Sequence, residues 1–160
     1  MKEIVLSGGE ITLVDDEDFE MLNKHSWSVV SNGGSSYARR ATTRNGKDVG
    51  LLMHRVIMAV EGSERIDHIN RNGLDNQKHN LRKATPSQNS KNKKAHGRSI
   101  YLGVCLKKGR IKNKWVAAIK PDVKTNPIHI GYFATEELAA LAYNKAAKIY
   151  HGEFANLNIL

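Results

Sequence analysis

Acidic, imidazole and amide side chains gather in one polar stretch of the chain, residues 65–94, and they are types that bind hard metal ions and move protons. Asp67 and His68 are adjacent, and Asn89 follows within the same stretch. Carboxylate and amide oxygens suit Mg²⁺ or Mn²⁺, which keep several waters and also accept phosphate oxygens as ligands. An imidazole beside such a cation is placed to take a proton from water. The stretch therefore indicates metal-assisted hydrolysis.

Short elements must bring these residues together. The alternation of apolar and polar residues and the turn formers between them predict two strands, at residues 66–69 and 80–83. Thr85 as N-cap and Pro86 as first helical residue then predict a helix that carries Asn89 in its first turns. A strand-strand-helix unit of this size lets the end of the first strand face the start of the helix.

The whole pattern, DHIN...LDN...NLR..T..QN..N, resembles the HNH endonucleases of the homing, phage-borne type, which have a ββα-metal fold. The resemblance implies that His68 is the general base, that Asp67 and Asn89 hold the Mg²⁺ or Mn²⁺ cofactor, and that Asn80 braces the hairpin. The alternative for the Asp-His pair is a polar hairpin with a satisfied histidine. The spacing over the whole stretch favours the nuclease.

The chain before this stretch is predicted to form strands and helices that support the nuclease motif. The predicted strands are residues 4–6, 11–14, 27–30, 37–42 and 49–52, and the predicted helices are residues 15–24 and 52–60. The acidic cluster at residues 15–20 is interpreted as an exposed helix start rather than a metal site, because consecutive carboxylates point in different directions. His54 is interpreted as structural, or as a neighbour of the site, rather than as a direct ligand.

Beyond a short linker at residues 95–99 the pattern changes to three strands and a helix. The strands are predicted at residues 100–107, 114–120 and 128–133. Thr135 is predicted to cap the helix and Gly152 to end it. The helix would bury Leu138, Leu141, Ala142 and Ile149, while its alanines allow close approach to the sheet. Trp115 is assigned to the core by its strand parity, and Cys105 to the surface.

The segments YLGV, KWVAAI, IGYF and TEELAALAYNKAAKIYHGEFANLN together resemble the AP2 DNA-binding domain of plant transcription factors, over residues 100–160. The resemblance implies that the sheet lies in the major groove of double-stranded DNA. The positions that it assigns to DNA contact are Lys107, Lys114, Lys120 and His129. Leu102, Cys105, Ala118 and His129 depart from the plant pattern, so a different or weaker sequence preference is expected.

Charge supports a polyanionic partner. The 160 residues carry a formal charge of +9, yet residues 1–20 hold seven acidic residues and one basic one. The remaining residues therefore hold a net +15. Six basic and no acidic residues lie between Arg82 and Arg98, a run suited to holding phosphates. The candidate phosphate contacts in this run are Arg82, Lys91, Lys93 and Lys94.

Other classes are disfavoured. The single Cys105 excludes a disulfide framework within the chain and a four-cysteine zinc knuckle. No apolar run approaches the ~20 residues that span a bilayer, and the Met-Lys-Glu start lacks the apolar region of a signal peptide. We therefore expect a soluble, intracellular protein without a membrane partner, in the cytoplasm of a bacterial or phage-infected host.

The sequence thus predicts an α+β chain with a nuclease domain at residues 1–94, a linker at 95–99 and an AP2-like domain at 100–160. The expected function is site-specific, metal-dependent hydrolysis of DNA phosphodiester bonds by a homing-type HNH endonuclease from a phage or mobile element. A single site cuts one strand per engagement, so a double-strand break would need a homodimer or sequential cutting. The alternative function is non-catalytic DNA binding with an inactive HNH scaffold.

Overall fold

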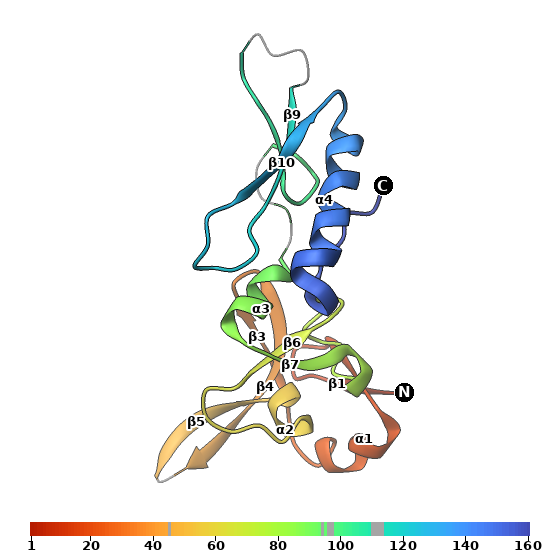
Figure 1. Ribbon diagram of the computed structural model, residues 1–160. Coiled ribbons are helices and arrows are strands. Elements are labelled where there is room, and N and C mark those ends of the chain that lie inside the picture. The colour runs from red at the N-terminus through yellow and green to blue at the C-terminus, as the bar shows by residue number, and fades with distance from the viewer. Residues whose placement is uncertain (45, 94, 96–97, 110–113) are drawn as a thin grey trace. The chain divides into compact units, whose positions relative to one another are not determined.

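The computed structural model describes residues 1–44, 46–93, 95, 98–109 and 114–160. The internal contacts divide the chain into two compact units, Met1–Thr85 and Pro86–Leu160. Both units combine short antiparallel sheets with helices (Figure 1), so the predicted α+β class is confirmed. The position of one unit relative to the other is not determined, and each is described by itself.

The division after Thr85 differs from the boundary expected from sequence. Helix α3 (Pro86–Lys91), which was predicted as part of the nuclease domain, has its contacts in the second unit. The predicted linker at 95–99 includes positions 96 and 97, which lie outside the described residues, as does Lys94. The linker therefore stays a prediction.

The first unit contains three small antiparallel sheets. Strand β1 (Lys2–Val5) pairs with β2 (Ile11–Val14), and β6 (Arg65–His68) pairs with β7 (Leu81–Ala84). The third sheet has the order β3-β4-β5, and its strands are Ser28–Asn32, Ser35–Arg44 and Lys47–Leu52. The described residues of this unit also form the helices α1 (Asp16–Leu22) and α2 (Met53–Ile57) and the 3₁₀ turn η1 (Lys78–Asn80).

Helix α2 is shorter than the predicted helix at 52–60. Ala59 has a φ of +47°, outside the right-handed helical region, and this turns the chain away. The Arg55 guanidinium then holds the following loop by donating to the backbone oxygens of Gly62 and Val60. The loop, β4, β5 and α2 line an open hollow of about 600 Å³.

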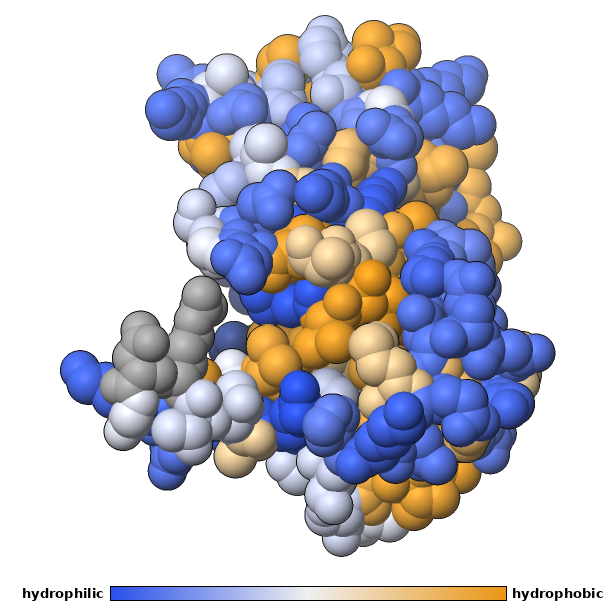
Figure 2. Space-filling model, turned by 90° about the horizontal axis from the view of Figure 1, so that it is seen from below, coloured by the Kyte–Doolittle hydropathy of each residue, from blue (hydrophilic) through white to orange (hydrophobic). Residues whose placement is uncertain are grey.

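Apolar side chains from the hairpins and helices form the core of the first unit. Trp27 is 1% exposed and its indole Nε1 donates to the carbonyl oxygen of Leu22 at 2.8 Å, so burial leaves this donor satisfied. The other buried core residues are Ile4, Leu6, Val14, Leu22, Ala38, Met53, Ile57 and Leu81. In the view of Figure 2, apolar surface runs through the middle of the face and polar residues flank it.

The second unit packs one helix on a three-stranded sheet. The sheet has the order β10-β9-β8, all antiparallel, with strands Ile128–Phe133, Trp115–Ile119 and Val104–Leu106 (Figure 1). Strand β8 begins later than predicted because Gly103 has a φ of +67°. A Cβ on Gly103 would lie 2.0 Å from the ring of Tyr143, so glycine is required there for close approach as well.

Helix α4 (Glu136–His151) begins and ends as predicted. The backbone N–H of Leu138 donates to the Thr135 hydroxyl at 3.3 Å, and Gly152 ends the helix with a φ of +57°. The short turn η2 (Gly152–Phe154) follows. No helix in the described part of the chain combines the length and apolarity that a membrane crossing needs.

The predicted buried stripe of α4 is wrong. Leu138, Leu141 and Ile149 are exposed, by 48%, 44% and 78%, and Ala142 is half-buried. The face that packs on the sheet is instead made of small residues with Tyr143 and His151 among them: Ala139, Ala140, Ala146 and Ala147. Small side chains bring the helix axis close to the sheet, and that close approach buries them rather than the leucines.

We predict that Ala147→Leu lowers the free energy of unfolding of the second unit by about 1–3 kcal/mol, because Ala147 is fully buried and a larger side chain overpacks the interface. Leu141→Ala, on the exposed face, should change it by less than about 0.5 kcal/mol. Urea denaturation followed by circular dichroism measures both. Equal effects of the two substitutions would contradict the observed packing.

Candidate active site

The Asp-His pair lies at the end of strand β6, paired with β7. The register places Asp67 opposite Arg82 and His68 opposite Leu81. Both Asp67 and His68 are 5% exposed. Arg82 donates from Nε and Nη2 to Oδ2 of Asp67, at 2.8 and 2.7 Å. The carboxylate is therefore oriented by its cross-strand neighbour.

The ring of His68 is enclosed by polar and aromatic partners. Its Nε2 lies 3.3 Å from Oδ1 of Asn76, and its centroid is 5.0 Å from that of His54 and 5.7 Å from that of Tyr37. Burial lowers the pKa of His68 below its ordinary value; the hydrogen bond to Asn76 and the charges of Asp67 and Asp75 oppose the change. The imidazole is thus neutral at neutral pH, which is the form that accepts a proton.

His54 packs edge-on against His68. The two ring planes are perpendicular, and burial lowers the pKa of His54 to about 3, with further lowering by His68 and Arg55. His54 Nδ1 is buried and, among the described residues, has no hydrogen-bond partner. The rings of His54 and Tyr37 also meet, at 5.6 Å. His54 therefore packs against His68 as an uncharged ring.

The loop between the two strands is braced by Asn80, which is 3% exposed. Its Oδ1 accepts from the backbone N–H of Asn70 at 2.9 Å, and its Nδ2 donates to the carbonyl oxygen of Asp75 at 2.7 Å. Its own carbonyl oxygen accepts from Ile69 N–H at 2.8 Å. The Asn80 side chain thus ties the end of the loop to its start at Asn70 and to its middle at Asp75.

A second support comes from the N-terminal hairpin. The backbone of Leu13 donates to the Leu74 carbonyl oxygen and accepts from Asn76 N–H, both at 2.8 Å. Asp15 accepts from the backbone N–H of Lys78 at 2.7 Å. The same loop also packs against the backbone of Ser36. A Cβ on Gly73 would lie 2.4 Å from the carbonyl oxygen of Ser36, so glycine allows this close contact. The loop therefore rests on segments far away in the sequence.

The acidic cluster at residues 15–20 has a role that the sequence did not suggest. The ammonium of Lys78 pairs with Glu17 and, at 3.2 Å, with Asp18, and Asp18 is only 9% exposed. The expectation of an exposed helix start is therefore only partly right. Contact with the loop around Lys78 explains the difference.

In the second unit, the predicted contacts Lys107, Lys114, Lys120 and His129 are all exposed. The backbone N–H of Lys107 donates to the Lys114 carbonyl oxygen at 2.7 Å, so these two lysines lie side by side at one end of the sheet. His129 meets Tyr132 with 4.8 Å between ring centroids. Cys105 is exposed, as predicted.

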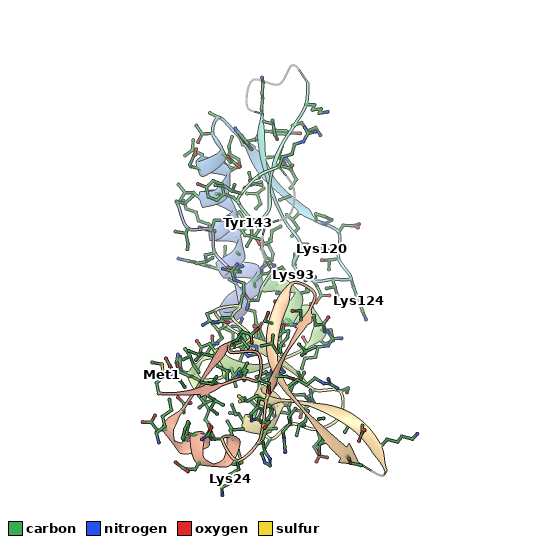
Figure 3. The ribbon with its side chains drawn as sticks, turned by 180° about the vertical axis from the view of Figure 1, so that it is seen from behind. Met1, Lys24, Lys93, Lys120, Lys124 and Tyr143 are labelled. Atoms are coloured by element: carbon green, nitrogen blue, oxygen red, sulfur yellow. The ribbon has the colours of Figure 1, made fainter. Side chains whose placement is uncertain are left out.

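A groove of about 450 Å³ in the second unit brings Lys120 together with two further predicted contacts. Lys91, Lys93 and Lys120 all line it, with Tyr143 and His151. Figure 3 shows Lys93 and Lys120 in the same part of the unit as Tyr143. His151 Nε2 lies 3.0 Å from the Lys120 carbonyl oxygen and so ties α4 to the end of β9. The carboxylate of Asp122 also lines the groove, so the three lysines give it a net positive charge.

Comparison with known proteins gives a relative for nearly the whole chain. An uncharacterised HNH endonuclease, L560, of Acanthamoeba polyphaga mimivirus is 33% identical over 162 aligned residues, which cover 94% of this chain and 75% of the viral protein. The chain belongs to the HNH endonuclease family. No family model and no solved structure matches it.

Part of the HNH chain also matches plant transcription factors. The ethylene-responsive transcription factor ERF024 of Arabidopsis thaliana is 44% identical over 59 residues, which are 37% of this chain and 31% of the plant protein. The dehydration-responsive element-binding protein 2E of rice gives the same identity over the same length, with 18% of its own chain covered. This member of the HNH endonuclease family therefore shares a segment with plant transcription factors.

Asp67 is the predicted metal ligand that the first unit places beside His68, and its chemistry fits a hard divalent cation. Mg²⁺ is usually held by one or two carboxylates together with water and phosphate oxygens. The second predicted ligand, Asn89, lies half-buried on α3 in the second unit, so its position relative to Asp67 is not determined. Within the described residues no group of three or more His, Cys, Asp or Glu side chains is placed to hold a metal ion.

Three residues around the HNH histidine were not singled out from the sequence: Thr12, Tyr37 and Asn76. Asn76 is fully buried, and an asparagine in a turn-rich loop gives no sequence signal of burial. Thr12 and Tyr37 are distant in sequence and read as ordinary strand residues. Only the tertiary contacts identify them.

We predict that Asn80→Ala lowers the free energy of unfolding of the first unit by about 1–3 kcal/mol, because Asn70 N–H and the Asp75 carbonyl lose their partners. The neighbouring His79 is exposed, so His79→Ala is the matched control and should change it by less than about 0.5 kcal/mol. Urea denaturation measures both. An Asn80→Ala protein as stable as the control would show that the side chain does not brace the loop.

Proposed function

We propose that this HNH protein is a metal-dependent DNA endonuclease of the homing type, which hydrolyses phosphodiester bonds at sites chosen by its second unit. The observation that carries the proposal is the buried, neutral His68 beside Asp67 at the end of a braced hairpin. Perturbed titratable groups held in a fixed geometry are typical of catalytic sites.

The chemistry follows from these side chains. A neutral His68 takes a proton from water, and the resulting hydroxide attacks the phosphorus of the scissile phosphodiester. A bond from water oxygen to phosphorus forms while the bond from phosphorus to the 3′ oxygen breaks, and the leaving oxygen takes up a proton from solvent. Asp67, positioned by Arg82, would hold the divalent cation together with Asn89. A bound Mg²⁺ or Mn²⁺ supplies positive charge against the charge that develops on the phosphate.

The second unit would bind DNA and so bring the cleavage site to its target. The match to plant transcription factors over 59 residues supports this role, and the exposed lysines of the unit suit phosphate contacts. Lys94 stays a predicted contact outside the described residues. The roles of Lys107, Lys114, Lys120 and His129 at the major groove are likewise part of the proposal. A break in both strands would require two copies or two successive cuts.

One observation favours the alternative of a non-catalytic DNA-binding protein. Arg82 was predicted as a phosphate holder, yet its guanidinium is bound to Oδ2 of Asp67. A cation on Asp67 must share the carboxylate with this arginine. If the arginine prevents cation binding, the fold serves only as a scaffold for DNA binding.

We predict that His68→Ala lowers the rate of DNA cleavage by about 10²–10⁴-fold, the usual worth of a general base, while DNA affinity is unchanged. His79→Ala, an exposed histidine of the same motif, should cut at the wild-type rate. Nicking of supercoiled plasmid at fixed Mg²⁺, with affinity from gel shift, measures both effects. Wild-type cleavage by His68→Ala would remove His68 from the proposed chemistry.

We also predict that the groove lysines bind DNA phosphates. Replacing Lys91, Lys93 and Lys120 together by Ala should make the plot of log affinity against log salt shallower by about 2–3, at ~0.9 for each phosphate that is no longer neutralised. Lys145→Ala with Lys148→Ala, exposed positions on α4 outside the groove, is the control. An unchanged slope in the triple variant would place the DNA elsewhere on the unit.

A further inference from the structure

Hydrogen bonds connect the N-terminal hairpin to the catalytic histidine through buried groups. The Thr12 hydroxyl lies 2.7 Å from the Leu74 carbonyl oxygen, Asn76 Nδ2 lies 2.8 Å from the Thr12 hydroxyl, and Asn76 Oδ1 lies 3.3 Å from Nε2 of His68. Thr12 and Asn76 are both fully buried. Water is thus kept from a path that runs from β2 to His68.

The direction of each hydrogen bond follows from the first one. A carbonyl oxygen only accepts, so the single hydroxyl hydrogen of Thr12 points to Leu74. The other neighbour of this hydroxyl, the sulfur of Met53 at 3.9 Å, is a weak acceptor and would also require Thr12 to donate. In both cases the Thr12 oxygen must accept from Asn76.

This requirement fixes the orientation of the Asn76 amide. The NH₂ group faces Thr12, so the carbonyl oxygen Oδ1 faces His68. An amide oxygen only accepts, and Nε2 of His68 must then carry a hydrogen. A neutral imidazole carries one hydrogen, so its other nitrogen, Nδ1, holds the lone pair.

We propose that Asn76, held by Thr12, is a positioning residue that selects the Nε2-protonated tautomer of His68 and so makes Nδ1 the nitrogen that accepts the proton of the attacking water. The catalytic part of this inference rests on the proposed endonuclease function. The tautomer itself is a property of the folded chain without DNA or metal. Asn76 and Thr12 act through His68 and need not touch the substrate.

The hydrogen bonds from Thr12 through Asn76 to His68 form the relay, and their buried surroundings favour one tautomer of His68 strongly. An amide turned by 180° would set its NH₂ group against Nε2 and its oxygen against the Thr12 oxygen, which leaves two acceptors face to face. In a buried site such a mismatch is enough to favour one orientation by about fivefold or more. The backbone hydrogen bonds of Leu13 to Leu74 and Asn76 hold the partners in register.

Nitrogen-15 NMR of the imidazole tests the tautomer directly. Two-bond ¹H–¹⁵N correlations distinguish a protonated from an unprotonated ring nitrogen, and the His68 signals are those that vanish in His68→Ala. At a pH where the ring is neutral, we expect Nε2 to be protonated and Nδ1 not. An Nδ1-protonated His68 in the wild-type protein would overturn the proposal, whatever the protein's activity.

A matched pair of variants tests the role of Thr12. Thr12→Val keeps the shape but removes the hydroxyl that orients Asn76, so both tautomers of His68 should become populated. Thr12→Ser keeps the hydroxyl and should retain the wild-type tautomer. The Leu74 carbonyl oxygen keeps its bond from Leu13 N–H in both, which limits the structural damage. A wild-type tautomer in Thr12→Val would contradict the relay.

Cleavage kinetics connect the relay to catalysis. Relative to Thr12→Ser, Thr12→Val should lower kcat by about 10–100-fold, the usual effect of removing a partner that orients a functional histidine, with KM for DNA unchanged. A decrease in Thr12→Ser equal to that in Thr12→Val would indicate a simple packing defect and overturn the role of the hydroxyl. If the wild-type protein binds DNA but does not cut, the proposed function fails while the NMR result still decides the tautomer.

Discussion

The docking of residues 12–15 onto residues 74–78 is the interaction on which the rest of the first unit depends. A two-stranded hairpin such as β6–β7 is marginally stable by itself in water. Here its long loop is bound by the backbone of Leu13, by the hydroxyl of Thr12 and by the carboxylate of Asp15. Those contacts fix Asn76 and Lys78, and through Asn76 they reach His68. The N-terminal hairpin therefore supports the candidate site around His68.

Ion pairs within the first unit account for part of the unequal charge distribution along the chain. Seven of the sixteen acidic residues lie in the first twenty positions. Several of them have partners within the unit: Asp16 pairs with the N-terminal ammonium at 2.6 Å, Glu17 and Asp18 with Lys78, and Glu20 with Lys2. These carboxylates therefore have local partners within the first unit. The net positive charge of the remaining residues is therefore available to attract a polyanion.

Local patterns predicted most of the elements and the motif but not its supports. Strand alternation and turn residues located the hairpins, and Thr135 and Gly152 marked the ends of α4 correctly. The contact from Thr12 to Asn76 spans 64 residues and has no local signature. Periodicity also misplaced the buried face of α4, because leucine was weighted above alanine where the sheet admits only small side chains. Likewise the pairing of Arg82 with Asp67 depends on strand register, which spacing alone did not fix.

The central claim is that this HNH fold cuts DNA with the help of a divalent cation. It is tested most directly by incubating supercoiled plasmid with the wild-type protein in Mg²⁺, in Mn²⁺ and in EDTA, and separating the products on a gel. The account predicts nicked circles with either cation and intact plasmid in EDTA. Intact plasmid under all three conditions, with DNA binding retained in a gel shift, would contradict it and leave a DNA-binding scaffold.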